Sequence, residues 1–349
     1  MRIAHIVWTL SIGGIQSMLV DIVNEQVKTQ DVAVFVVNDV YNAELFSIID
    51  KRVLIVKCGR KPGSKNPFLI LKMNWILHNY NPDIIHCHED KLTDLLLNYK
   101  TPLVRTIHNT HSSSKEYNRF KRLCCISNAV KSYTTRQGYP DSVIVYNGIH
   151  TDLIPMRTAP SANTESKRIV CVGRLHPMKG QTVLIESANE LISRRCIKNF
   201  TIDFIGDGEL RETLEQLSIK YGIQNHIRFL GSKPREWFYP KLKDYDLFVL
   251  PSISEGFGLT LAEACAAKIP VLTCDLPGPM EVIANGRYGC VFKTGNPHSL
   301  TEEMEKILLN GEDIHKVDDA YLYVKTHFDV TITSQQYVDI YNELISQVK

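Results

Sequence analysis

The sequence predicts an α/β protein of two domains, each with a parallel sheet covered by helices on both faces. Apolar runs of strand length alternate with helical stretches along the whole chain, and this pattern is typical of a parallel sheet with crossover helices. The chain has 349 residues, which is more than one hydrophobic core normally supports, so two domains are expected.

The strands fall into two series. The first is predicted near 3–8, 32–37, 52–56, 83–88, 103–108, 122–127 and 142–146, and the second near 168–174, 200–206, 226–231, 246–251, 269–274 and 289–293. Residues 151–166 between the series are polar, contain two prolines and lack periodicity, which is typical of a linker.

We therefore predict a first domain at 1–158, a second domain at 166–328, and a terminal segment at 329–349 that forms an amphipathic helix. Both domains are expected to be Rossmann-type and to face each other across a cleft. Ligands of such sheets bind at the carboxyl ends of the strands.

The composition excludes several classes of protein. With 44% hydrophobic and 22% charged residues, the chain is expected to be soluble and globular. No apolar run reaches the roughly 18 residues of a transmembrane helix, and the first ten residues lack the cleavage site of a signal peptide. Nine scattered cysteines without a Cys-x-x-Cys pair indicate reduced core residues and a cytosolic protein.

Positive charge is concentrated in the first domain. Residues 1–150 hold 18 Lys or Arg against 12 Asp or Glu, and no acidic residue occurs between Lys51 and Asp83. Within 51–75 the basic residues Lys51, Arg52, Lys57, Arg60, Lys61, Lys65 and Lys72 accompany the apolar residues Pro67, Phe68, Leu69, Ile70, Leu71 and Trp75. Two interpretations stay open, a solvated loop with a core-facing helix, or a patch that contacts anionic lipid.

Two glutamates flank a glycine-rich turn in the stretch SISEGFGLTLAEACAAKIPV, at 252–271. Glu255 and Glu263 are eight positions apart, which on a continuous helix is about 12 Å of rise, and a hydrolase pair must lie within roughly 5 to 9.5 Å across one bond. We interpret them as holding opposite ends of one elongated ligand. The helix start near Gly258 offers an anion site for a diphosphate between them. The alternative is that either glutamate closes a capping box, with Thr260 or Ser252 as its partner.

A basic loop in the same domain supports the diphosphate hypothesis. The stretch VGRLHPMKG at 172–180 follows a strand and carries Arg174 and Lys179. Two cations on a strand-exit loop are able to neutralise a diphosphate and the charge that develops when a glycosyl bond breaks. Alone, such a loop is more often an exposed basic turn.

In their order along the chain these residues resemble the retaining glycosyltransferases of family 4, which have the GT-B fold. The resemblance rests on Gly13-Gly14, His108, GRLHPMKG, the GDG at 206–208, the FLG at 229–231, and EGFGLTLAE with its E-x7-E spacing. It is most specific at 172–271.

The resemblance implies a role for each matching residue. Glu255 is expected to bond the hydroxyls of the donor sugar, and Glu263 to bind the ribose diol. Arg174 and Lys179 are expected to grip the donor diphosphate. The remaining implied donor contacts are the backbone amides of Phe257, Gly258 and Leu259, the glycine loop of Gly13 and Gly14, and the side chain of His108. The terminal helix is expected to cross back onto the first domain.

Other signals point elsewhere or stay open. His150 stands where the family commonly has Asp, so the role of the turn at 147–150 is open. The histidines of 86–89 and 108–111 lack the spacing of a helical zinc pair and are interpreted as structural or substrate-contacting. Asp244-Tyr-Asp246 is interpreted as a surface turn. We expect no metal ion, no hydride-transfer cofactor, because no GxGxxG follows the first strand, and no nucleic acid partner.

The resemblance and the residues together predict a metal-independent, retaining glycosyltransferase. It is expected to move a sugar from a nucleotide diphosphate sugar to an acceptor hydroxyl on a glycan or glycolipid, in bacterial surface polysaccharide biosynthesis such as that of lipopolysaccharide or capsule, with peripheral contact at the inner face of the plasma membrane. The alternatives are a sugar-nucleotide 2-epimerase of the same architecture and an inactive nucleotide-binding subunit.

Overall fold

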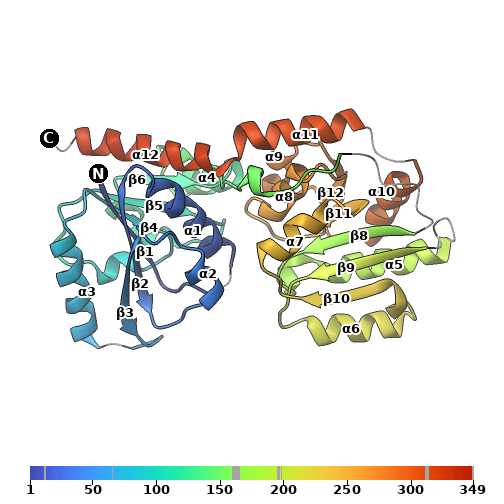
Figure 1. Ribbon diagram of the computed structural model, residues 1–349, viewed down its shortest axis with the longest axis horizontal. Coiled ribbons are helices and arrows are strands. Elements are labelled where there is room, and N and C mark those ends of the chain that lie inside the picture. The colour runs from blue at the N-terminus through green and yellow to red at the C-terminus, as the bar shows by residue number, and fades with distance from the viewer. Residues whose placement is uncertain are drawn as a thin grey trace. The chain divides into compact units, whose positions relative to one another are not determined.

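The computed structural model describes residues 1–11, 13–64, 66–158, 166–194, 197, 199–310 and 314–347. The chain packs as two compact units, one made of Met1–Ile149 with Phe328–Lys349 and one made of His150–His327. Each is an α/β unit with a parallel sheet, and every strand predicted from the sequence is present (Figure 1).

The division between the units lies after Ile149, and not after residue 158 as predicted. Thr151–Leu153 forms a short 3-10 helix. The Arg157 amide then donates to the Ala267 carbonyl at 2.9 Å, and the Arg157 guanidinium lies 3.6 Å from the Asp246 carboxylate. These contacts tie the start of the predicted linker to the second unit. Residues 159–165 of that linker lie outside the described residues.

In the described chain, the sheet of the first unit has seven parallel strands in the order β3-β2-β1-β4-β5-β6-β7. The chain order reverses between β1 and β4, so the edge beyond these two strands is the switch point where such sheets bind ligands. The strands are β1 Arg2–Val7, β2 Asp31–Asn38, β3 Leu54–Arg60, β4 Ile84–Cys87, β5 Leu103–Ile107, β6 Arg122–Cys125 and β7 Val143–Ile144.

Helices cover both faces of this sheet. Val32, Val34 and Val36 of β2 pack in one cluster with α1, whereas Val37 shares a small space with Met73 of α3 on the opposite face. Successive strand residues point to opposite faces, which explains the two contacts. The helices of the unit are α1 Gly14–Gln26, α2 Ala43–Ser47, α3 Pro67–Tyr80, α4 Asn128–Arg136 and α12 Val330–Ser346.

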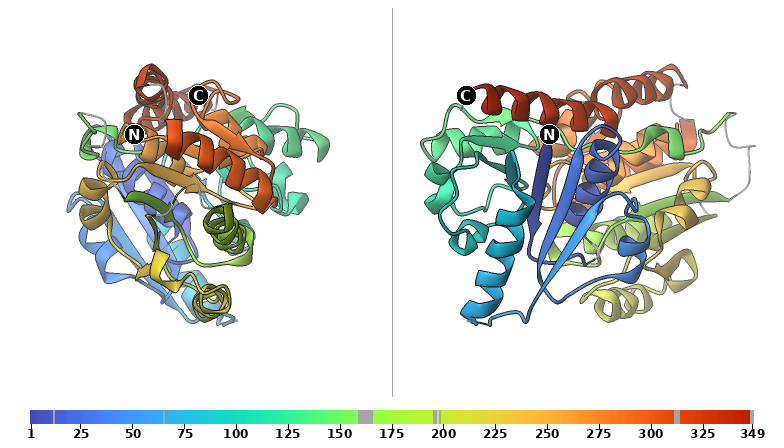
Figure 2. Two further views of the ribbon diagram at one scale, coloured as in Figure 1. Left: turned by 90° about the vertical axis from the view of Figure 1, so that its right-hand side faces the viewer. Right: turned by 60° about the vertical axis from the view of Figure 1, so that its left-hand side comes forward.

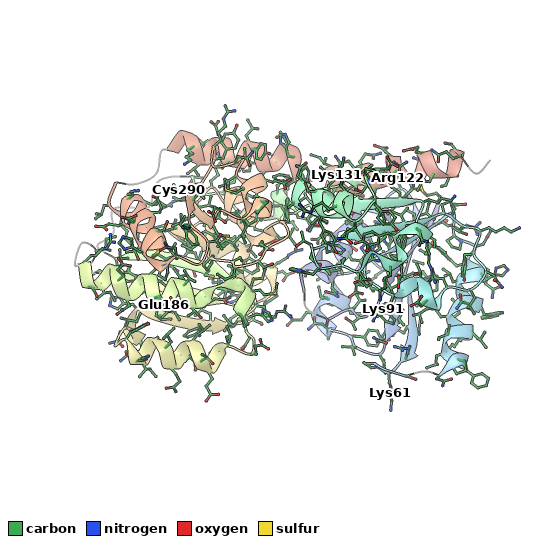
Figure 3. The ribbon with its side chains drawn as sticks, turned by 180° about the vertical axis from the view of Figure 1, so that it is seen from behind. Lys61, Lys91, Arg122, Lys131, Glu186 and Cys290 are labelled. Atoms are coloured by element: carbon green, nitrogen blue, oxygen red, sulfur yellow. The ribbon has the colours of Figure 1, made fainter. Side chains whose placement is uncertain are left out.

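The terminal helix α12 packs on the first unit beside α1, as predicted (Figure 1, Figure 2). Tyr337 and Tyr341 are fully buried in a core cluster with β1, β4 and β5. An ion pair of 2.6 Å joins Arg122, labelled in Figure 3, to Glu343 on the helix. Residues 348 and 349 of the predicted terminal segment lie outside the described residues.

The turn at 147–150, whose role the sequence left open, receives the start of α12. Ile149 donates its amide to the Phe328 carbonyl and accepts from the Val330 amide, both at 2.9 Å. A side chain at Gly148 would collide with the Val330 backbone. The glycine is therefore required by close backbone packing.

The sheet of the second unit has six parallel strands in the described chain, in the order β10-β9-β8-β11-β12-β13. Its strands are β8 Lys167–Val172, β9 Phe200–Ile205, β10 Ile227–Gly231, β11 Leu247–Leu250, β12 Val271–Cys274 and β13 Cys290–Phe292. Its helices are α5 Gln181–Arg194, α6 Arg211–Lys220, α7 Arg235–Leu242, α8 Leu259–Ala266, α9 Pro277–Val282, α10 Pro297–Asn310 and α11 Ile314–His327.

The switch point of this second sheet lies between β8 and β11, so a ligand is expected at the carboxyl ends of these two strands. The loops that carry Arg174, Lys179 and Glu255 leave the sheet at this edge. Among the helices of the described chain, none combines the length and apolar character required to cross a bilayer.

Candidate functional site

The loops after β8 and β11 are joined by an ion pair. The Lys179 ammonium lies 2.6 Å from the Glu255 carboxylate, and the same carboxylate oxygen accepts from the Ser252 hydroxyl at 3.3 Å. Both side chains are partly buried. The structure thus brings together two predicted site residues that are separated by 76 positions in the sequence.

Backbone contacts fix the position of this ion pair. The amides of Ile253 and Ser254 donate to the Met178 carbonyl at 2.9 and 3.1 Å. Gly180, directly after Lys179, has φ of 66°, and a Cβ there would collide with the Pro251 carbonyl oxygen. Only glycine combines this left-handed conformation with so close an approach.

The GDG sequence at 206–208 packs against the loop that carries Arg174 and Lys179. The motif is too short for this role to be recognised from the sequence. A Cβ at Gly206 would collide with the Gly173 carbonyl, and one at Gly208 with the Leu175 carbonyl. The Leu175 amide donates to the Asp207 carbonyl at 3.0 Å. The loop after β9 therefore packs directly against the backbone of the basic loop.

We expect the substitution Gly180→Ala to lower both the stability and the activity of the protein. The alanine must adopt a positive φ, at a cost of about 1–2 kcal/mol, and must also push the Pro251 backbone away, which displaces Lys179 from Glu255. Gly222→Ala is the matched control, because Gly222 has φ of 69° and open space around it. Thermal unfolding should show a larger loss for Gly180→Ala. Equal losses for the two variants, with activity kept, would show that the close contact has no role.

Helix α8 begins at the expected place for an anion site. Its N-cap is Gly258, with φ of 106°, and no side chain caps the helix. The first amides of a helix, here from Leu259 onward, lack intrahelical acceptors and carry the positive end of the dipole. The Phe257 side chain is buried, so only its backbone is suited to a ligand contact.

The capping-box alternative is wrong for both glutamates. Thr260 is the second residue of α8 and not its N-cap, and Glu263 is the fifth of the eight residues of the helix. No helix follows Ser252 directly; the chain from there to Glu255 is a loop. Neither carboxylate therefore closes a helix end.

Glu263 is held inside the second unit. It is only 3% exposed, accepts from the Tyr239 hydroxyl at 2.8 Å and lies 3.6 Å from the Arg235 guanidinium. Sequence reasoning missed Tyr239 and Arg235, because α7 matches no motif. The buried partners hold the carboxylate in one position, as a binding group requires.

Arg174 is the exposed member of the predicted set. Its carbonyl accepts from the Gln181 side chain at 2.9 Å, which fixes the backbone. For the guanidinium, no ion-pair partner is found among the residues that the structure describes. Arg174 and Lys179 thus lie on the loop after β8, and Glu255 and the start of α8 follow β11, the neighbouring strand of the sheet.

The predicted residues of the first unit lie at the carboxyl ends of β1 and β5. Gly13 is the N-cap of α1 and Gly14 its first residue. His108 directly follows β5, and its Nε2 atom is covered from solvent without a hydrogen-bond partner. Burial, aided by the nearby Arg105 charge, lowers the pKa of His108 to about 3.

His108 belongs to a buried histidine cluster that sequence reasoning recognised only in part. Its ring stacks on His88 at 6.0 Å, and His88 stacks on His86 at 4.2 Å. His5 of β1 belongs to the same cluster. Its Nδ1 atom makes a hydrogen bond of 3.0 Å with His88 Nε2, and its Nε2 atom makes one of 2.8 Å with Gln26 Oε1. Only the parallel pairing of β1 with β4 reveals this fourth member.

The ring nitrogens of His5, His86 and His88 come within 4.8 Å of one another, which is close enough to consider a metal ion. His86, however, uses Nδ1 for the Tyr341 hydroxyl at 2.6 Å and Nε2 for the Thr106 hydroxyl at 2.8 Å. Ligation would break these buried bonds. We interpret the cluster as a structural network that holds α12 and supports His108.

Two acidic residues make backbone contacts that the sequence did not indicate. Asp246 is not simply part of a surface turn, since it accepts from the Arg168 amide at 2.8 Å at the start of β11; Asp244 is exposed as expected. Glu89, after β4, accepts from the Trp8 amide at 2.6 Å, and burial raises its pKa. Glu89 was missed as a group that fixes the loop after β1.

Comparison with known proteins agrees with this architecture. Residues 12–153 match the family model described as Glycosyltransferase Family 4, and residues 155–320 match the model described as Glycosyl transferases group 1. An uncharacterized glycosyltransferase of Methanocaldococcus jannaschii is 25% identical over 69% of this chain and 69% of its own length. The phosphatidyl-myo-inositol mannosyltransferase of Mycobacterium leprae is 23% identical over 74% of this chain and 73% of its own length.

Several other relatives match over less than half of their own length. Among solved structures, the Anabaena protein HepE in complex with UDP and glucose superposes with a TM-score of 0.80 at 20% identity, covering 98% of this chain and all of HepE. Both units of this protein are therefore those of a GT-B glycosyltransferase, the first matching Glycosyltransferase Family 4 and the second Glycosyl transferases group 1.

Proposed function

We propose that this glycosyltransferase moves a sugar from a nucleotide diphosphate sugar to an acceptor hydroxyl with retention at the anomeric carbon. The observation that carries the proposal is the Lys179–Glu255 ion pair of 2.6 Å. Exposed Arg174 lies on the same loop as Lys179, and the uncapped start of α8 follows Glu255 in the chain. HepE, which has the same fold, binds UDP and glucose, and this supports a donor of the nucleotide-sugar class.

In the proposed reaction, the diphosphate lies against Lys179, Arg174 and the first amides of α8. The diphosphate oxygens replace the Glu255 carboxylate as the partner of Lys179, and Glu255 becomes free to bond the sugar hydroxyls. Glu263 holds the ribose. His108, Gly13 and Gly14 are proposed to contact the donor from the first domain.

When the glycosyl bond breaks, negative charge develops on the diphosphate, next to the side chains of Lys179 and Arg174. The bond between the anomeric carbon and the diphosphate oxygen breaks, and the acceptor oxygen forms its bond on the same face. The acceptor proton passes to the departing diphosphate. Fixed positive groups stabilise the charge on this leaving group more in the transition state than in the bound donor. No covalent enzyme intermediate and no metal ion are required.

We propose a glycan or glycolipid acceptor, as in bacterial surface polysaccharide assembly, and action at the inner face of the plasma membrane. The mannosyltransferase relative is named for phosphatidyl-myo-inositol, a lipid, and the basic character of the first domain suits a lipid-linked acceptor at an anionic surface.

The proposal is tested by incubating the purified protein with a panel of nucleotide diphosphate sugars, with and without EDTA. We expect slow hydrolysis of one donor to free nucleotide and sugar, equally fast in EDTA. NMR of the sugar as it is released to water should first show the anomeric configuration of the donor. Conversion of the donor to its 2-epimer would identify an epimerase, and binding without turnover an inactive subunit. Either result would contradict the proposed transfer.

A further inference from the structure

Helix α3 divides its apolar residues between two faces. Met73 and Leu77 are buried against the sheet. Asn74 fixes the helix by donating to the Leu95 carbonyl at 2.8 Å and accepting from the Leu97 amide at 3.0 Å. For residues 51–75, the interpretation of a core-facing helix is therefore confirmed, but only for one side of α3.

The opposite side of α3 is apolar and faces solvent. Phe68, Leu71 and Trp75 are 76%, 54% and 68% exposed, and their spacing of three and four residues places them on one stripe of the helix. Phe68 and Trp75 have the highest exposure of the large hydrophobic side chains that the structure describes. We call these three residues the α3 stripe.

Packing within the first unit does not explain the α3 stripe. Leaving a large apolar side chain in water forgoes roughly 1.5–3 kcal/mol relative to burial. A contiguous apolar stripe on a surface helix that is already anchored on its other side is typical of a binding surface. The question is which partner covers it.

The charges around the α3 stripe favour an anionic partner. Exposed Lys72 lies beside the α3 stripe, three residues before Trp75. Exposed Lys61, labelled in Figure 3, lies in the turn that leads to α3. No acidic residue occurs between Lys51 and Asp83. A cation beside exposed aromatic rings is the pattern of helices that lie in a membrane interface, where Trp is preferred.

Three of the other basic residues of 51–75 are engaged in contacts within the first unit. Arg52 pairs with Asp50 at 2.8 Å, and Arg60 donates to the Asn38 side chain at 2.8 Å. The Lys57 ammonium lies over the Phe46 ring at 4.3 Å. Lys65 lies outside the described residues. The contact surface is thus narrower than the whole segment.

We propose that the α3 stripe inserts into the interface of an anionic lipid bilayer, with Lys72 and Lys61 at the headgroups. The helix has 14 residues, about 21 Å of length, and lies in the plane of the membrane. This inference does not depend on the transferase activity, because it concerns only where the first domain binds. Loss of donor turnover and loss of lipid binding are separate results.

The test is flotation of the full-length protein with two kinds of vesicle. One kind contains phosphatidylcholine alone, and the other also contains about 30% phosphatidylglycerol, which makes its surface anionic. We expect flotation on the anionic vesicles at low salt, reduced by high salt. The triple variant Phe68→Ser/Leu71→Ser/Trp75→Ser should lose it. Lys72→Ala and Lys61→Ala should each weaken binding about fivefold. Trp75 fluorescence should shift to the blue on binding.

Ile219→Ser/Leu322→Ser is the matched control, because both side chains are exposed in the second unit; it should float like the wild type. Circular dichroism checks that the triple variant is folded. The proposal is overturned if the wild type does not float at low salt, or if the triple variant floats equally well. A wild-type dimer that the triple variant abolishes, without any vesicle binding, would assign the stripe to a second copy and also overturn it.

Discussion

Replacing Glu255 or Lys179 with alanine is expected to lower turnover about 10²–10³-fold, the usual loss for one preorganised electrostatic contact to a transition state. In the proposed mechanism, Lys179 supplies charge to the departing diphosphate, and Glu255 orients the sugar. Both changes lower kcat with saturating donor, since the lost contacts act on the transition state more than on donor binding.

Stability should change little in these two variants. The ion pair is partly exposed, and such pairs contribute about 0–1 kcal/mol. Glu212→Ala and Lys220→Ala serve as controls, because both side chains are exposed on α6 of the same unit. Steady-state kinetics and thermal unfolding on the four variants make the comparison. Full activity of Lys179→Ala in excess donor would remove Lys179 from the mechanism.

The first unit is expected to lose stability steeply as the pH falls below about 6.5. Burial lowers the pKa of His5 to about 4 and, together with the Arg105 charge, that of His108 to about 3. Burial also holds the pKa of His86 and His88 well below the ordinary value. In the unfolded chain all four titrate near 6.5, so the unfolded state binds more protons below that pH.

The sign follows from this proton difference. The stability that the neutral cluster provides is complete above pH 6.5 and is lost as the pH falls toward 4, by up to about 1.4 kcal/mol per pH unit for each histidine. His5 alone accounts for about 3 kcal/mol over the whole window.

Hydrogen exchange with mass spectrometry at pH 6.5 and 5.0, corrected for intrinsic rates, reports each unit separately. We expect loss of protection in β4 and α12, and a smaller change in β9. In the His5→Asn variant, the loss of stability per pH unit should be smaller by the contribution of one histidine, up to about 1.4 kcal/mol. Equal protection at both pH values would contradict the account.

The sequence predicted the strands of both sheets because each is an uninterrupted apolar run with clear ends. It also predicted the terminal helix, whose apolar residues recur at helical spacing. Strand order and domain limits are different, because they depend on contacts between distant residues. Arg157 bonds Ala267, and nothing in the local pattern at 151–166 indicates that contact.

The candidate site shows the same difference. The EGFG turn and the basic loop were recognisable because glycine and charge mark them locally. The pairing of Lys179 with Glu255 and the burial of Glu263 under Tyr239 are products of strand order. The glycines at 206 and 208 look uninformative in sequence, and their purpose becomes clear only when the facing carbonyl groups are known.

The histidine cluster shows how a motif is only partly described without its partners. From their spacing, His86 and His88 are interpreted as structural or substrate-contacting histidines and not as a helical zinc pair. Their actual environment includes His5 from β1 and Tyr341 from α12, which are remote in sequence. Spacing along one strand carries no information about neighbours that come from another strand or from the end of the chain.

The most direct test of the central claim is a crystal structure of the protein with the nucleoside diphosphate that it releases from its donor. We predict that the diphosphate lies within hydrogen-bond distance of Lys179 Nζ and of the first amides of α8, that Arg174 contacts it, and that the ribose reaches Glu263. A diphosphate bound elsewhere, with the Lys179–Glu255 pair unchanged, would contradict the account.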